Sequence, residues 1–120
     1  MNTVQFLEAI RITEPDEARY SVVEKHYGVN LEDDVRRVCS LNPPPFWEGR
    51  EVCRVLSLPE IVHAESELHV AFGSLGLVPI LDRGDNNFVV YNVRIHQWAM
   101  FNIIDEVMWY QGKPLEELLP

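Results

Sequence analysis

The hydrophobic spacing of this chain is mainly helical in its first part and mainly strand-like in its second, and this division restricts the possible folds more than any other feature. Leu31, Val35 and Val38 recur at the spacing of one helix face. Residues 88–93 are mainly aromatic and β-branched, as in a strand. Helices followed by strands, with few parallel crossovers, are typical of an α+β fold. With 120 residues in total, we expect one domain over residues 1–120.

Start and stop signals place the helices. Thr13 can cap a helix whose first turn holds Pro15 and which ends at Gly28. Ser57 and Glu60 form a capping-box pattern that opens a later helix, and the glycines after residue 72 end it. The expected helical segments are residues 4–12, 13–28, 31–39, 57–72 and 113–119.

Strand signals lie mostly in the second half of the chain. The three prolines at 43–45 exclude a helix or a central strand, so residues 42–49 are expected to form a stiff loop. Residues 82–87 have the composition of a turn, and Pro79 suggests an edge strand or a strand start. The expected strands are residues 52–56, 77–81, 88–93 and 97–103, and their order predicts an antiparallel sheet.

The net charge of −9 narrows the range of partners. Lys and Arg total 10 against 19 Asp and Glu, and the excess acid is divided almost evenly between the two halves of the chain. Binding to nucleic acid or to an anionic membrane needs clustered basic residues, so neither is expected. An acidic surface instead favours a basic protein partner, because opposite charges accelerate association.

The cysteines and the N-terminal residues bear on the cellular compartment. Cys39 and Cys53 lie in apolar runs at a spacing that fits no metal motif, so they form either one disulfide or two buried thiols. The first residues lack the basic region of a secretory signal, and no apolar run approaches the ~20 residues of a membrane span. A cytoplasmic location is therefore expected.

No pattern of catalytic or metal-binding residues is complete, and we expect no metal or cofactor. One polar cluster could be a cation site, a partner-facing loop or a plain β-turn, and it lacks the spacing of an EF-hand; its members are Asp82, Asp85, Asn86 and Asn87. The four histidines have no partner at metal spacing. No serine lies in a nucleophile elbow. His96 with a nearby carboxylate leaves a small hydrolase as one alternative function.

The order of these segments resembles the SUKH superfamily, named for a yeast cell-wall-synthesis regulator and its bacterial relatives. The resemblance covers about residues 13–119, and its most specific part is the strand-turn-strand over residues 77–91. Further similar segments are residues 24–35, 56–61, 98–103 and 115–119. The chain departs from the family pattern at Glu32, where the family has proline, and at residues 42–44, where it has Asn-Gly-Gly.

The resemblance implies a strongly curved antiparallel sheet flanked by helices. It also implies a function, because most bacterial members look like cytoplasmic immunity proteins. Such proteins are not enzymes; they bind and neutralise a cognate polymorphic toxin domain, often a nuclease. A regulatory adaptor unrelated to toxins is the alternative that the eukaryotic members suggest.

Rigidly presented aromatic and turn residues are the candidate partner-binding site. Phe46 and Trp47 follow the prolines, where they either anchor a partner or fold back as a lid over the core. The full candidate set for contact with a basic toxin is Phe46, Trp47, Asp82, Arg83, Asp85 and Asn86.

Overall fold

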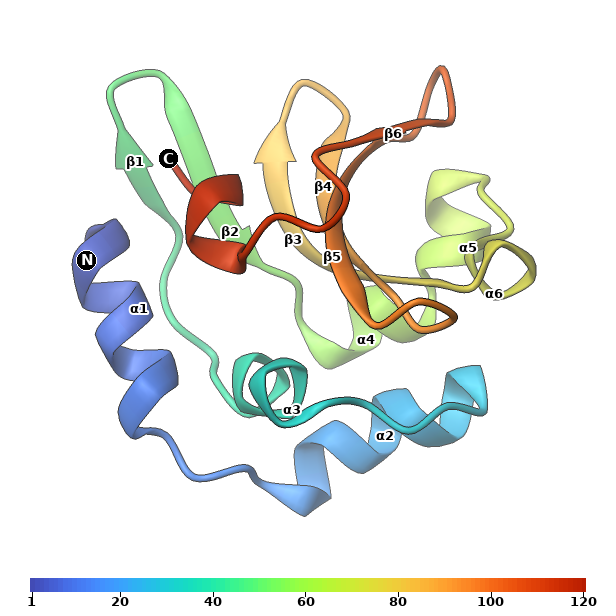
Figure 1. Ribbon diagram of the computed structural model, residues 1–120, viewed down its shortest axis with the longest axis horizontal. Helices are drawn as coiled ribbons and strands as arrows, with labels where there is room; N and C mark the ends of the chain where they lie inside the picture. Colours follow the sequence, from blue (N-terminus) through green and yellow to red (C-terminus); the bar gives the residue numbers. More distant parts are fainter.

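The computed structural model describes residues 1–120 and consists of one six-stranded antiparallel sheet with helices around it (Figure 1). The helices are α1 Thr3–Ile12, α2 Glu17–Tyr27, α3 Asp33–Cys39, α4 Leu58–Val62, α5 Ala64–Leu68, α6 Phe72–Leu75 and the 3₁₀ helix η1 Leu115–Leu118. The strands are β1 Phe46–Glu48, β2 Glu51–Val55, β3 Leu77–Gly84, β4 Asn87–Asn92, β5 Gln97–Asn102 and β6 Val107–Trp109. The predicted α+β class is confirmed.

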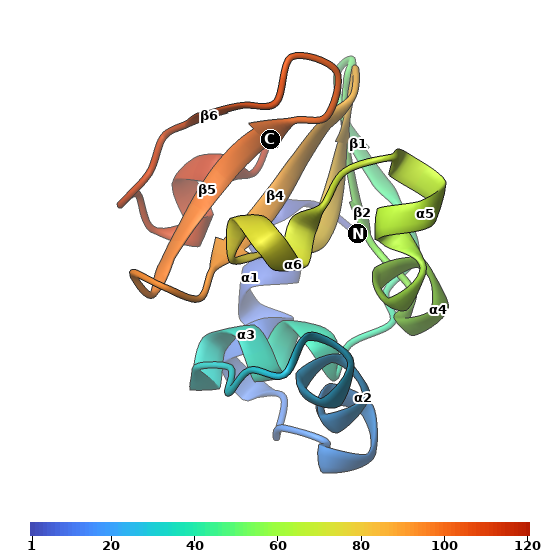
Figure 2. The same ribbon diagram turned by 90° about the vertical axis from the view of Figure 1, so that its right-hand side faces the viewer.

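The sheet is a meander, in which each strand pairs antiparallel with the next along the chain in the order β1-β2-β3-β4-β5-β6. Figures 1 and 2 show that it is open and strongly twisted. Such a meander needs no parallel crossover, and consecutive turns alternate between its two ends.

Helices lie on both faces of the sheet. Helices α4, α5 and α6 lie on one face, where Phe72 of α6 packs edge-on against Phe101 of β5 at 5.9 Å between ring centroids (Figure 2). Helix α3 and η1 lie on the other face, where Trp98 Nε1 donates a hydrogen bond of 2.8 Å to Asp34 Oδ2. One continuous core joins the sheet to both layers, so the chain is a single domain. None of the helices is both long and apolar enough to cross a membrane.

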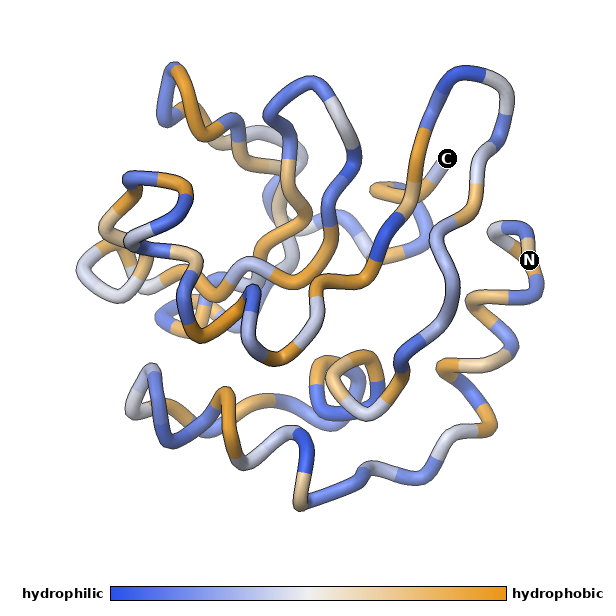
Figure 3. Tube along the Cα trace, turned by 180° about the vertical axis from the view of Figure 1, so that it is seen from behind, coloured by the Kyte–Doolittle hydropathy of each residue, from blue (hydrophilic) through white to orange (hydrophobic).

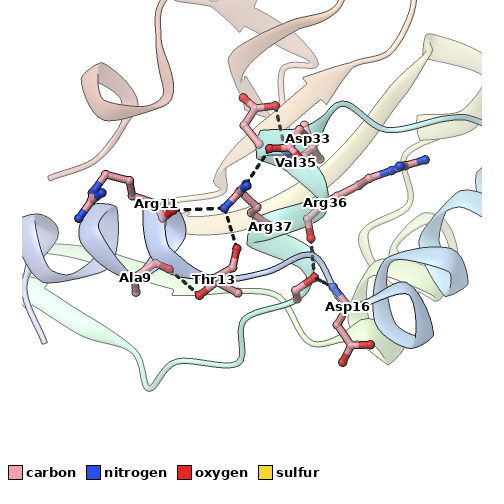
Figure 4. A network of polar contacts seen from close by, with 10 residues as sticks. Ala9, Arg11, Thr13, Asp16, Asp33, Val35, Arg36 and Arg37 are labelled. Atoms are coloured by element: carbon pink, nitrogen blue, oxygen red, sulfur yellow. Dashed lines mark hydrogen bonds and ion pairs between the residues drawn. The ribbon is translucent and has the colours of Figure 1, made fainter.

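Polar contacts fasten the first three helices to one another (Figure 4). Arg37 of α3 donates from Nη1 to the carbonyl oxygen of Thr13 at 2.8 Å and from Nε to Asp33 at 2.7 Å. Ser40 Oγ accepts from the backbone N–H of Asp16 at 2.7 Å. The start of the second helix therefore differs from the prediction. Asp16 is its N-cap, whereas Thr13 ends α1 and Pro15 lies in the linker.

The predicted single helix over residues 57–72 is wrong beyond its first turns. The Ser57 capping box does open a helix, but that helix ends at Val62. His63 then separates α4 from α5, and His69 ends α5 in the left-handed conformation with φ 56°. The sequence did not predict these breaks, because neither glycine nor proline, the residues that usually mark a helix end, occurs between Pro59 and Gly73.

Two strands lie outside the predicted elements. Residues 42–49 are only partly a loop, because Phe46–Glu48 pairs with β2 as strand β1. Strand β6 pairs with the end of β5. Strand β3 is central rather than an edge, yet it tolerates Pro79, which lies beyond the residues paired with β2 and beside a register shift against β4. Near the C-terminus, Pro114 is the N-cap of η1 rather than a first-turn residue.

The two cysteines are free and buried, with exposed fractions of 2% for Cys39 and 1% for Cys53. Burial raises the pKa of each thiol to about 12. Of the two alternatives that the sequence left open, the structure has buried thiols.

These thiols make stability sensitive to alkali. In the unfolded chain they ionise near their ordinary pKa of 9.0, while the folded protein retains both protons up to about 12. The unfolded state therefore binds fewer protons above pH 9, and the free energy of unfolding is expected to fall between pH 9 and 12. Urea denaturation across this range measures the loss.

Labelling with iodoacetamide should be slow in the native state and rapid in urea, and equal rates would contradict the burial.

Candidate functional site

Three hairpin turns lie together at one end of the sheet, which we call the hairpin edge. It consists of residues 49–50, 85–86 and 103–106, which join β1 to β2, β3 to β4 and β5 to β6 (Figure 1). They share one end because alternate turns of a meander must do so. Figure 3 shows the first two turns as mainly hydrophilic, while the third includes a hydrophobic stretch. Ile104, 68% exposed, lies in that third turn.

The central turn of the hairpin edge is explained by its own geometry. Asp85 and Asn86 have positive φ angles of 53° and 65°, as a two-residue type I′ turn requires. Asn86 also accepts a 3.0 Å hydrogen bond from the N–H of Ile103 in the neighbouring turn. Both residues are exposed. They meet the geometric needs of the turn and remain accessible to a partner.

Below the hairpin edge lies a cleft of about 570 Å³. Three aromatic side chains line it: Trp47 from β1, Trp109 from β6, and Tyr110 immediately after β6. Trp47 is 64% exposed and Tyr110 is 56% exposed. The rings of Trp109 and Tyr110 meet edge to face, 6.4 Å apart at 67°. We call this cavity the aromatic cleft.

Charged side chains from β2, β3, two of the hairpin turns and η1 complete the aromatic cleft. Its carboxylates are Glu51, Asp85 and Glu117, and its guanidinium groups are Arg50 and Arg83. Asp85 has no ion-pair partner, whereas Glu117 lies 3.7 Å from Lys113 Nζ. The cleft therefore presents aromatic faces with acidic groups beside them.

Arg83 lines the cleft, but its side chain is largely buried and hydrogen-bonded within the fold. Its side chain is only 9% exposed. Its Nε donates to the carbonyl of Leu118 at 2.9 Å, and its Nη1 donates to the carbonyl of Val52 at 2.6 Å. Its Nη2 lies 3.9 Å from a carboxylate oxygen of Glu51. Arg83 thus ties β2 and the C-terminal segment to β3, and little of it is left to face a partner.

Asp82 lies away from the aromatic cleft and belongs to a separate ion-pair cluster. Arg54 contacts Asp82 at 3.3 Å and Glu60 at 2.8 Å. The hydrogen bond from Arg54, helped by the Ser57 cap, lowers the pKa of Glu60. This cluster joins β2 and β3 to α4, so the sequence-predicted group divides between two places.

Phe46 is also separated from the candidate surface. It is 4% exposed and packs on Phe6 of α1 with ring centroids 5.7 Å apart. Side chains alternate along a strand, so Trp47 points away from this core contact. From the predicted set, Trp47, Arg83 and Asp85 line the same cleft, and Asn86 lies beside Asp85 in the turn above it. Phe46 and Asp82 lie elsewhere, in core packing and in an ion-pair cluster.

The sequence prediction missed the residues that complete the aromatic cleft. Trp109 and Tyr110 read as core aromatics, yet Tyr110 is exposed and Trp109 is only partly buried. The signal for them was the short apolar run 107–109 directly after Asp105 and Glu106, which is the pattern of a hairpin's second strand. Glu117 and Arg50 come to the cleft only through tertiary packing.

His96 contacts Glu32 at the surface and lines none of the cavities. Its Nδ1 lies 2.7 Å from Glu32 Oε1, and its side chain is 63% exposed. The structure therefore has no cleft at His96 in which the substrate of a hydrolase could bind. No three His, Cys, Asp or Glu side chains converge as ligands of a metal ion would.

Almost all arginines are engaged in contacts within this chain, whereas several carboxylates at the hairpin edge have no partner. Every arginine except Arg50 donates to a carboxylate or a carbonyl oxygen of this chain. At the hairpin edge, Asp85, Asp105 and Glu106 have no ion-pair partner. The free charge at this edge is therefore predominantly negative.

Comparison of the chain with family models, with curated proteins and with solved structures gives no match.

Proposed function

We propose that this protein is an intracellular immunity protein of the SUKH type, which binds a basic toxin domain and neutralises it by occlusion rather than by catalysis. The observation that carries the proposal is the pairing of a hairpin edge rich in unpaired carboxylates with exposed aromatic side chains beneath it. The order of sequence motifs supports the same class.

The two parts of this surface have different roles in the proposed mechanism. Unpaired carboxylates attract a basic domain and raise the rate of encounter. Exposed aromatic side chains on short, paired strands lose little conformational entropy on binding, so they hold the complex once it forms. The toxin is then neutralised by occlusion, because the bound immunity protein covers its active face and excludes its substrate.

Co-expression with a basic toxin domain encoded by a neighbouring gene tests the proposal. We expect the protein to restore growth and to co-purify with the toxin at low salt. Failure of both growth rescue and complex formation would remove the toxin as the partner.

Neutralising part of the hairpin edge should slow association without abolishing it. The variant Asp105→Asn/Glu106→Gln removes two unpaired carboxylates from the third turn, and its matched control, Glu14→Gln/Glu17→Gln, removes two exposed ones near the start of α2. At low salt we expect a decrease of about three- to tenfold in the association rate for the edge variant and a smaller one for the control. Surface plasmon resonance measures both. A larger effect from the control would place the encounter surface elsewhere.

A further inference from the structure

The aromatic cleft has more accessible aromatic surface than folding alone explains. Trp47 and Tyr110 are each more than half exposed, and both border the same cavity. Tyr110 also has a φ of 57°, a left-handed backbone that bulky residues rarely adopt. Its side chain gains little burial in return for that strain. Backbone strain of this kind recurs at binding sites, where the surrounding structure holds a side chain in position.

We propose that the aromatic cleft binds an arginine or lysine side chain of a protein partner. The faces of Trp and Tyr rings carry negative electrostatic potential and attract a cation placed within about 6 Å. The edge-to-face arrangement of Trp109 and Tyr110 gives a cation one ring face and an angled second ring. Arginine is the stronger candidate, because its planar guanidinium group stacks on aromatic rings and is weakly hydrated.

The charges around the aromatic cleft favour a cation over an anion. Arg83 has two of its nitrogens committed to backbone carbonyls and the third near Glu51. Asp85 has no ion pair, and Glu51 and Glu117 contribute two further carboxylates, of which Glu117 lies 3.7 Å from Lys113 Nζ. An anionic ligand would meet these carboxylates and gain only the exposed Arg50. This inference deepens the proposed function, on which it rests for the identity of the partner.

Short charged peptides test the cleft without any toxin. Hexaarginine, hexalysine and hexaglutamate are titrated into the full chain, and isothermal titration calorimetry gives each Kd. We expect hexaarginine to bind more tightly than hexalysine, and hexaglutamate to give no binding. No binding of hexaarginine, or tighter binding of hexaglutamate, would overturn the proposal.

Two cleft variants and one control then locate the binding. Trp47→Ala removes an exposed ring, and Tyr110→Gly removes the other while suiting the left-handed backbone. Each is expected to weaken hexaarginine binding by about three- to tenfold at physiological salt. The control Ile95→Ala removes a 48% exposed apolar side chain from the β4–β5 turn, at the opposite end of the sheet. It is expected to bind like the unaltered protein, and equal Kd values for all four proteins would exclude the cleft as the site.

The toxin experiment separates this inference from the proposed function. If the unaltered protein and the two cleft variants protect cells and bind the toxin equally, the function stands and the cleft proposal fails. If the unaltered protein does not protect while hexaarginine still binds at the cleft, the cation site stands and the toxin proposal fails.

Discussion

Replacing Phe46 with alanine is expected to lower the free energy of unfolding by about 3–5 kcal/mol, whereas Trp47→Ala should change it by less than about 0.5 kcal/mol. The two residues are adjacent in β1 and differ in environment. Phe46 is 4% exposed and packs on Phe6, while Trp47 is 64% exposed. Truncating Phe46 leaves a cavity between α1 and the sheet, and truncating Trp47 removes surface that solvent already reaches.

Urea denaturation followed by far-ultraviolet circular dichroism measures both variants with the same probe. The comparison is internally controlled, because each variant removes an aromatic side chain from the same short strand. Equal losses of stability would contradict the assignment of one residue to the core and its neighbour to the surface. Trp47→Ala is then a well-folded reagent for the binding experiments, and any loss of affinity reports on contact rather than on unfolding.

Replacing Arg83 with methionine is expected to lower the free energy of unfolding by about 2–4 kcal/mol. Its guanidinium group donates to the carbonyls of Val52 and Leu118, and methionine would leave both acceptors without their charged donor. Arg83→Lys should recover less than half of the loss, because a single ammonium group cannot reproduce the two-directional geometry of the guanidinium.

Arg50→Met is the matched control for Arg83→Met. Arg50 lines the same cleft and carries the same charge, but it is exposed and makes no ion pair. Its substitution should change stability by less than about 0.5 kcal/mol. Chemical denaturation measures stability, and limited proteolysis should show faster cleavage after residue 110 only in the Arg83 variant. If both arginine variants were equally stable, the anchoring role of Arg83 would be excluded.

The sequence predicted the helix ends that depend on one residue's own conformational preference. Gly28 ends α2 at φ 65°, and Ser57 caps α4 through the predicted hydrogen bonds. The strands β4 and β5 were also predicted, because their residues are mainly aromatic, β-branched or apolar on alternate sides, and the structure buries both faces. The prediction failed for β1 and β6. Each has only three residues, and each is defined as a strand by its neighbour.

The candidate site was predicted less completely than the fold for a related reason. Turn composition identified Asp85 and Asn86, because a tight turn depends on its own residues. The burial of Arg83 depends instead on Leu118, which lies 35 residues away in the sequence. The cleft combines residues of β1, β3, β6 and η1, and no local pattern records that arrangement.

The meander also determines how the chain can fold while it is being made. Every strand pairs with its immediate predecessor. Four of these pairs are hairpins of residues close in the sequence, and such local pairing favours rapid folding, whereas β2 and β3 pair across the segment that holds α4, α5 and α6. The longest-range polar contact joins Thr3 Oγ1 to the carbonyl of Pro120 at 2.8 Å. During synthesis the sheet can therefore grow strand by strand, but α1 acquires its contact with Pro120 only after that residue has left the ribosome.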